Sequence, residues 1–155
     1  MRRWLWISLL VIALDQLSKL VADQLLSYAQ PVAVMPMFNL TLLYNKGAAF
    51  SFLASASGWQ RWFFLTLTLL VSAFIFHWLR KLKPHQFLHM IALALILGGA
   101  LGNLIDRAIY GHVIDFIDVY FQQHHWPAFN IADSAISIGA VLLIYDTLKN
   151  PHENS

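Results

Sequence analysis

The sequence predicts an all-α membrane protein, a four-transmembrane-helix bundle that carries a small extramembrane β-sheet on its outer face. Three observations predict this fold. The composition is 59% hydrophobic and only 12% charged, whereas soluble domains carry about a quarter charged residues. Four apolar stretches are long enough to cross a bilayer, which takes about 20 helical residues. Basic residues gather on one side of these stretches, as the positive-inside rule requires.

The four expected spans run approximately over Trp4–Leu26, Trp59–Leu79, Phe87–Ile105 and Ile131–Leu148. The basic clusters are Arg2-Arg3 before the first span, Arg80, Lys81 and Lys83 between the second and third, and Lys149 after the fourth. Short loops rich in Lys and Arg stay on the cytoplasmic side. We therefore expect a single integral membrane domain over 1–155 with both termini in the cytoplasm, so that the longer segments 27–58 and 106–130 are external.

The first span also has an interpretation as a cleaved signal peptide, because Arg2-Arg3, an apolar run and Ser27-Tyr28-Ala29 imitate the three regions of such a peptide. However, Asp15, Lys19 and Asp23 place charge between the apolar run and the supposed cleavage site, and an apolar face continues past them. A retained helix therefore fits the pattern better.

Short strands are predicted in the two external segments. Val32–Leu43 and His112–Phe121 are rich in β-branched and aromatic residues, which favour strands over disordered loops. Prolines and glycines punctuate both segments. We expect a small sheet that rests on the bundle.

The residue inventory argues against several classes of function. Without cysteine, the chain has no thiolate nucleophile, disulfide or Cys-ligated metal. A net charge of only +2 in short clusters makes nucleic acid a poor partner. Neither His-Glu-x-x-His nor Gly-x-Ser-x-Gly occurs, which argues against a zinc protease or a serine nucleophile elbow. Histidines 112, 124 and 125 are more typical of the membrane interface than of a metal site, so we expect no metal and no cofactor.

Polar side chains within or beside a span are costly unless paired or solvated, so each one suggests a partner or a function. Asp15 and Lys19 are four residues apart and share a helical face, where they can neutralise each other. A structural ion pair is the simpler interpretation, and support of an external site is the alternative. Asn45 and Gly47 suit a tight turn, with contact to a substrate as the alternative.

The third span ends in a run of small and polar residues. Gly98 and Gly102 form a small-xxx-small pair that lets another helix approach closely. Gly99, Asn103 and Arg107 advance along one face, which places an amide and a guanidinium one turn apart. Snorkelling to the interface is a sufficient explanation for Arg107. It does not explain Asn103, which lies deeper.

Two further aspartates are predicted on the external side. Asp115 lies between bulky apolar neighbours, and Asp133 falls in the expected first turn of the fourth span, where Asn130 can cap the helix. Each has a structural explanation by itself. Together they are two carboxylates on one side of the membrane beside apolar groups, which is what an acid–base dyad requires.

Taken together, these motifs resemble signal peptidase II, the family of bacterial prolipoprotein signal peptidases, which are intramembrane aspartic proteases. The resemblance covers essentially the whole chain. Its motifs are Asp15-x-x-x-Lys19, Asn45-x-Gly47-Ala48-Ala49-Phe50, Gly98-Gly99-x-x-Gly102-Asn103-x-x-Asp106-Arg107, Val113-Ile114-Asp115-Phe116 and Phe129-Asn130-x-Ala132-Asp133.

The resemblance implies an endopeptidase that removes the signal peptide from diacylglyceryl-modified prolipoproteins, cutting on the amino side of the lipidated cysteine. Asp115 and Asp133 are then the expected catalytic pair. The expected substrate-binding residues are Asn45, Gly47, Asn103, Arg107 and Asn130, and the expected structural support is Asp15, Lys19 and Asp106. The resemblance also implies a monomer in the bacterial inner membrane, in contact with membrane lipid, with its site near the periplasmic face.

Two other classes of function remain open from the residues alone. A proton-coupled transporter or channel component would use Asp15, Asp106 and Asp133 as a relay, although the sequence has no paired half-repeats or broken spans. An assembly scaffold that packs through Gly98 and Gly102 would leave the polar face without a role. Substitution of Asp115 and Asp133 separates the three hypotheses.

Overall fold

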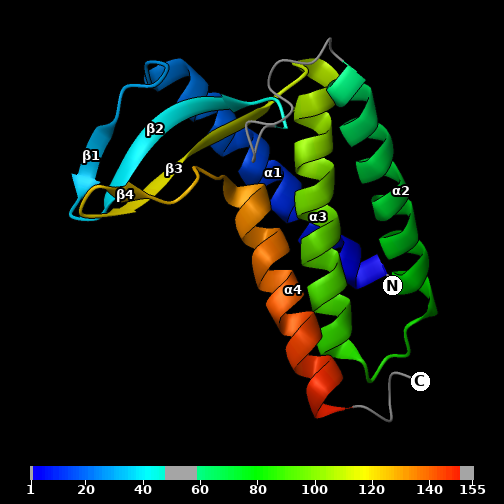
Figure 1. Ribbon diagram of the computed structural model, residues 1–155. Helices are drawn as coiled ribbons and strands as arrows, with labels where there is room; N and C mark the ends of the chain where they lie inside the picture. The colour runs from blue at the N-terminus through cyan, green and yellow to red at the C-terminus, as the bar shows by residue number, and fades with distance from the viewer. Residues whose placement is uncertain (1, 48–58, 151–155) are drawn as a thin grey trace.

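The computed structural model describes residues 2–47 and 59–150. The elements in that part of the chain are α1 (Arg2–Leu25), β1 (Val32–Met35), β2 (Phe38–Asn45), α2 (Trp59–Lys81), α3 (Phe87–Ile109), β3 (Val113–Phe121), β4 (His124–His125) and α4 (Ile131–Lys149). Figure 1 shows the helices packed lengthwise with the sheet at one end of the bundle. All four helices are long and apolar enough to cross a membrane. The predicted bundle with its small sheet is confirmed.

Helix α3 continues beyond the boundary that the sequence indicated. The expected span stopped at Ile105, where charged residues begin, but α3 runs on through Asp106 and Arg107 to Ile109. The Asp106 carboxylate lies 2.8 Å from the ammonium group of Lys19. Because a partner on another helix neutralises this charge, the charge does not end the helix.

Helix α3 is the centre of the bundle and packs against α1, α2 and α4. Of its span, 61% is buried, compared with 17% for the span in α2. The glycines explain how closely α1 approaches. A Cβ on Gly98 would lie 2.9 Å from the Cα of Ser8, and one on Gly102 would lie 2.7 Å from Oδ2 of Asp15. The predicted close helix contact at these two glycines is therefore confirmed, and α1 is the partner.

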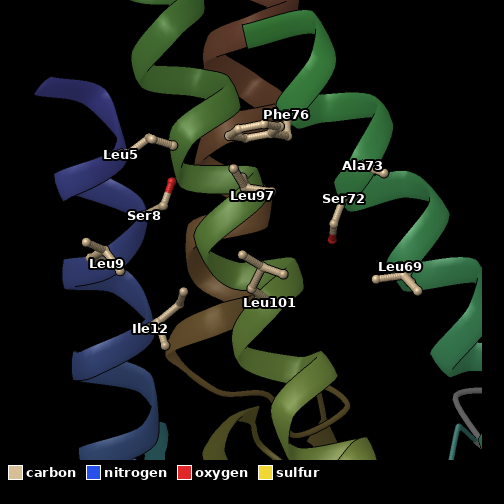
Figure 2. A pocket seen from close by; sticks show the side chains of 10 residues that line it. All are labelled: Leu5, Ser8, Leu9, Ile12, Leu69, Ser72, Ala73, Phe76, Leu97 and Leu101. Carbon is tan, nitrogen blue, oxygen red and sulfur yellow. The ribbon is translucent and has the colours of Figure 1, made fainter. Parts of the chain in front are cut away.

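An apolar groove of about 390 Å³ opens between α1 and α2, with α3 as its floor. Figure 2 shows Leu97 and Leu101 of α3 in this floor, with side chains of α1 and α2 on either side. Two other α3 residues face α4 instead, since Gly99 abuts Ala132 and Asn103 donates to Asp133. The groove thus lies on a different face of α3 from the polar cluster described below.

The sheet is antiparallel in the order β1-β2-β3-β4. Its longest pairing joins β2 to β3, from Phe38 opposite Val119 to Asn45 opposite Val113. This register brings the end of β2 beside the start of β3. Strand β4 was not predicted from the sequence. It pairs with the end of β3 and turns the chain back toward α4.

Candidate active site

Asp115 is the third residue of β3, and only 2% of it is exposed. Both carboxylate oxygens accept a hydrogen bond from a side-chain amide. Nδ2 of Asn130 donates to Oδ1 at 2.7 Å, and Nδ2 of Asn45 donates to Oδ2 at 3.1 Å. A buried carboxyl group needs such partners, and here they come from the segment before α4 and from the end of β2.

The chain before α4 is tied directly to β3. The carbonyl of Phe129 accepts hydrogen bonds from the backbone N–H groups of Phe116, at 3.1 Å, and Ile117, at 2.9 Å. The N–H of Phe129 donates in turn to the carbonyl of Ile117 at 3.1 Å. These bonds hold Asn130, the next residue, against Asp115.

Asp133 lies in the first turn of α4, as predicted, and is partly exposed. Its backbone N–H donates to Oδ1 of Asn130 at 2.9 Å, so the predicted cap by Asn130 is confirmed. Nδ2 of Asn103 donates to Oδ1 of Asp133 at 2.8 Å. The partial positive charge at the start of α4 also favours an anion at this position.

Asn130 connects the two aspartates. The residue is fully buried. Its Oδ1 caps α4 at Asp133, while its Nδ2 faces Asp115 and also reaches the carbonyl of Ile114 at 3.2 Å and Oδ1 of Asn103 at 3.3 Å. Because both ends of the Asn130 amide are hydrogen-bonded, the Asp115 carboxylate on β3 and the first turn of α4 cannot move independently.

The pKa of Asp115 rises from 3.8 to about 7, because burial disfavours its charged form and because the charge of Asp133 repels it. Hydrogen bonds from Asn45 and Asn130 and the charge of Lys19 oppose this rise. Asp115 therefore holds a proton for a large part of the time near neutral pH. A protonated carboxyl beside a second carboxyl group is able to exchange protons with a molecule bound between them.

Arg107 flanks the cluster from the last turn of α3. Its guanidinium lies 5.5 Å from the ring centre of Phe64 on α2, and Nη1 donates to the carbonyl of Asn103 at 3.4 Å. Asp133 and Asp115 attract its charge. Within the described chain no hydrogen bond joins the guanidinium to either carboxylate, so a direct role for Arg107 stays a prediction.

Gly47 lies in the turn after β2. Its N–H donates to Oδ1 of Asn45 at 2.9 Å, its φ is +95°, and a Cβ here would overlap the ring of Phe64. Conformation and space therefore both require glycine. The next three residues of the motif, numbers 48–50, lie outside the described residues.

Behind the cluster, Lys19 pairs with two buried carboxylates. Its Nζ lies 2.8 Å from Oδ2 of Asp15 and 2.8 Å from Oδ2 of Asp106. The predicted pair of Asp15 and Lys19 is confirmed, and Asp106 joins it from α3. Nζ also donates to Oδ1 of Asn103 at 3.0 Å, which connects this triad to Asp133. The triad is therefore in contact with the aspartate cluster.

Gln16 and Asp118 are polar groups that the sequence analysis missed. Gln16 donates through Nε2 to Oδ1 of Asp106 at 2.8 Å, and its signal was an amide next to Asp15 in an apolar span. Asp118 is 5% exposed and accepts hydrogen bonds from Asn39, at 3.3 Å, and Thr41, at 3.0 Å. His125 contacts the same carboxylate at 2.7 Å. No sequence pattern distinguished Asp118 from its neighbours.

The predicted site residues fall into two groups. Those brought together around the aspartates are Asn45, Asn103, Asp115, Asn130 and Asp133, with Arg107 and Gly47 at the edge. Those behind them are Asp15, Lys19 and Asp106. Among the described residues, no three His, Asp or Glu side chains are grouped as a metal site would need.

The chain is similar to proteins of known class along nearly its whole length. A profile described as signal peptidase (SPase) II matches residues 7–149. The lipoprotein signal peptidase of Aeromonas hydrophila subsp. hydrophila is 52% identical over 149 residues, covering 96% of this chain and 89% of the relative. That of Burkholderia mallei is 58% identical over 146 residues, covering 94% and 87%. A solved structure, described as a bacterial membrane enzyme determined by the in meso method, superimposes with a TM-score of 0.86 at 31% identity and covers 100% and 93% of the two chains.

Proposed function

Since this chain belongs to the signal peptidase II family, whose members remove signal peptides from prolipoproteins, we propose that it does so as an aspartic endopeptidase with Asp115 and Asp133 as its catalytic pair. The observation that carries the proposal is the position of Asn130. Its side chain donates to the Asp115 carboxylate at 2.7 Å and caps the helix at Asp133 at 2.9 Å. Two carboxyl groups that give and take protons in one reaction must keep a fixed position relative to each other. The Asn130 side chain, which is bonded to both residues, fixes that position.

The proposed reaction uses one proton on the pair. Ionised Asp133 takes a proton from water as the water oxygen bonds to the scissile carbonyl carbon, and Asp115 gives its proton to the carbonyl oxygen. The tetrahedral diol then collapses. Asp133 passes its proton to the leaving nitrogen as the C–N bond breaks, and Asp115 recovers a hydroxyl proton as the new carboxyl group forms. The raised pKa of Asp115 supports its role as the proton donor.

Asn103 and Arg107 are the proposed positioning groups. Asn103 already donates to Asp133, and the guanidinium of Arg107 is attracted to both aspartates. Charge-assisted donors aimed at a developing oxyanion lower the barrier of acyl transfer. The transporter alternative is less well supported, because Lys19 holds both Asp15 and Asp106 in ion pairs.

The resemblance extends the proposal to the substrate, a diacylglyceryl-modified prolipoprotein cut on the amino side of its lipidated cysteine. We place the enzyme in the inner membrane as a monomer with the pair near the periplasmic face. Asp133 lies at the start of α4, whereas Arg80 and Lys81 lie at the other end of the bundle, in the last turn of α2. Basic residues on the far side support a site that faces the periplasm.

The test uses purified protein and a lipid-modified precursor peptide. Asp115→Asn and Asp133→Asn are nearly isosteric, so each is expected to remain folded and to lose cleavage. Asp118→Asn is the matched control, because Asp118 is a buried aspartate of the same strand that is bound by other partners; it is expected to keep cleavage. A metal chelator is expected to have no effect. Near-normal turnover in either of the first two variants, or inhibition by the chelator, would contradict the two-aspartate mechanism.

A further inference from the structure

We propose that Asp15, Lys19 and Asp106 form a clamp that sets the separation of the two catalytic carboxyl groups, with Gln16 as its fourth member. The inference rests on the proposed roles of Asp115 and Asp133. It assigns positioning roles to residues that do not touch the substrate in the proposed reaction.

The ammonium group of Lys19 has three hydrogens and three acceptors. They are Oδ2 of Asp15 and Oδ2 of Asp106, both at 2.8 Å, and Oδ1 of Asn103 at 3.0 Å. Lys19 is 2% exposed, Asp15 is 0% and Asp106 is 1%. All donors of the ammonium group are therefore used inside the protein, and the position of each acceptor depends on the other two.

Each carboxylate of the clamp also holds a backbone amide. Oδ1 of Asp15 accepts the N–H of Ala132 at 2.9 Å, and Oδ2 of Asp106 accepts the N–H of Ile114 at 3.2 Å. Ala132 immediately precedes Asp133, and Ile114 immediately precedes Asp115. The clamp thus accepts a hydrogen bond from the backbone N–H of the residue that precedes each catalytic aspartate.

The contact with Asn103 adds a third constraint. An amide that presents its oxygen to the Lys19 ammonium must present its NH₂ group elsewhere, and here Nδ2 faces Asp133 at 2.8 Å. Lys19, together with Nδ2 of Asn130 at 3.3 Å, therefore holds the oxygen of the Asn103 amide and leaves its NH₂ group to the catalytic carboxylate. A neutral side chain in place of Lys19 would remove the shorter of the two hydrogen bonds to that oxygen.

Gln16 holds the clamp from α1. Its Nε2 donates to Oδ1 of Asp106 at 2.8 Å and to the carbonyl of Gly102 at 3.2 Å. A buried ionic cluster contributes little net stability, because its desolvation cost offsets its attraction. Geometric control over the two aspartate segments is a function that apolar residues of similar volume cannot supply.

Gly102→Ala is the most direct test, because it disturbs the clamp without removing a polar group. The added Cβ would lie 2.7 Å from Oδ2 of Asp15 and displace that carboxylate. Misplacing reacting groups by about 1 Å lowers turnover by about 100-fold, so kcat is expected to fall by about that factor with KM within about twofold of wild type. Burial, the larger cause of the raised pKa of Asp115, is expected to remain, but Asp133 is expected to move away from Asp115, so that its repulsion weakens and the pKa of Asp115 falls. The pH above which cleavage declines is therefore expected to move below its wild-type position.

Gly98→Ala is the matched control. Its Cβ would lie 2.9 Å from the backbone of Ser8 and 2.8 Å from Cβ of Val11, so it crowds the same pair of helices away from the clamp. It is expected to lower the melting temperature more than Gly102→Ala does and to keep kcat and the pH profile. If Gly98→Ala does not fold, Gly139→Ala serves as the control, because its added Cβ crowds α4 against Ala92 of α3.

If Gly102→Ala does not fold, a second variant with its own control tests the same proposal. Gln16→Leu removes the donor to Asp106 and is expected to lower kcat and shift the pH profile in the same direction. Its control is Ser8→Ala, which loses a buried hydrogen bond of 2.7 Å from α1 to the backbone carbonyl of Ala94 on α3, away from the clamp. Folded Gly102→Ala or Gln16→Leu with wild-type kcat and pH profile would overturn the clamp alone, provided that Asp115→Asn and Asp133→Asn are inactive. Turnover in those two variants would overturn the proposed dyad and the clamp together.

Discussion

Asn130 donates a hydrogen bond of 2.7 Å to Asp115, a residue 15 positions earlier in the chain. Asn130→Asp tests what this donor contributes, because aspartate can still cap α4 through an oxygen but presents a carboxylate to Asp115 in place of NH₂. Losing one preorganised donor costs about 100-fold or more in kcat, and we expect a loss at least that large. The measurement is turnover of the lipid-modified precursor peptide.

The control for that variant is Asn39→Asp, which replaces an amide that donates to the noncatalytic Asp118 at 3.3 Å. It makes the same chemical change at another buried amide that donates to an aspartate of β3. Because Asn39 and Asp118 share no hydrogen bond with the dyad among the described residues, cleavage is expected to stay within about twofold of wild type. If both variants lost the same fraction of kcat, the substitutions would be acting through general damage to the fold and not through the dyad.

The pH dependence follows from the pKa of Asp115, about 7, which burial and the charge of Asp133 raise. If protonated Asp115 is the donor, cleavage is expected to decline as the pH rises above about 7. Of the charges around this carboxyl group, Asp133 favours the protonated form, and Lys19 and Arg107 favour the ionised form. A rate profile that is flat between pH 6 and pH 9, values chosen roughly one unit or more either side of that pKa, would exclude this role.

Stability is expected to change with pH in the same region. Because the pKa is higher in the folded protein than its ordinary value of 3.8, the folded state binds the proton more tightly. The stabilisation from this group is complete below about pH 4 and is lost as the pH rises to about 7. In Asp115→Asn this loss of stability between acidic and neutral pH is expected to disappear. The measurement is the melting temperature of the wild type and of the variant at acidic and at neutral pH. Parallel curves would argue against a raised pKa.

Arg107→Lys keeps a positive charge but lacks the planar fork of the guanidinium and its stacking on Phe64. We expect kcat/KM to fall by about tenfold in Arg107→Lys and by about 100-fold in Arg107→Ala, the range for loss of a transition-state donor. Arg80→Ala, at the opposite end of α2, is the control and is expected to retain activity. Full activity of Arg107→Ala would reduce Arg107 to an anchor at the membrane interface.

The proposed orientation predicts the location of reporter fusions. Fusions after Leu82 and after Lys149 are expected to report a cytoplasmic location, because the basic clusters remain on that side. A fusion near Gln123, in the turn between β3 and β4, is expected to report a periplasmic location. A periplasmic C-terminus would contradict the orientation and would put the aspartate pair on the wrong side of the membrane.

The sequence by itself determined the features that depend on neighbours along the chain. Apolar runs of spanning length predicted the four helices, and the spacing of four between Asp15 and Lys19 predicted their ion pair. The order of Asn130 and Asp133 predicted the cap at the start of α4. Helix periodicity, capping and membrane partition act over a few residues or over a whole segment, so their patterns can be read without knowing the fold.

Only the tertiary structure decided which distant groups meet. Nothing in the local sequence pairs Lys19 with Asp106, directs the amide of Asn45 to Asp115, or gathers Asn39 and Thr41 around Asp118. The same contacts explain why α3 runs past its expected end. Hydrogen bonds and ion pairs depend on distances of about 3 Å in space, and these distances are set by how helices and strands pack, which no periodicity along the chain encodes.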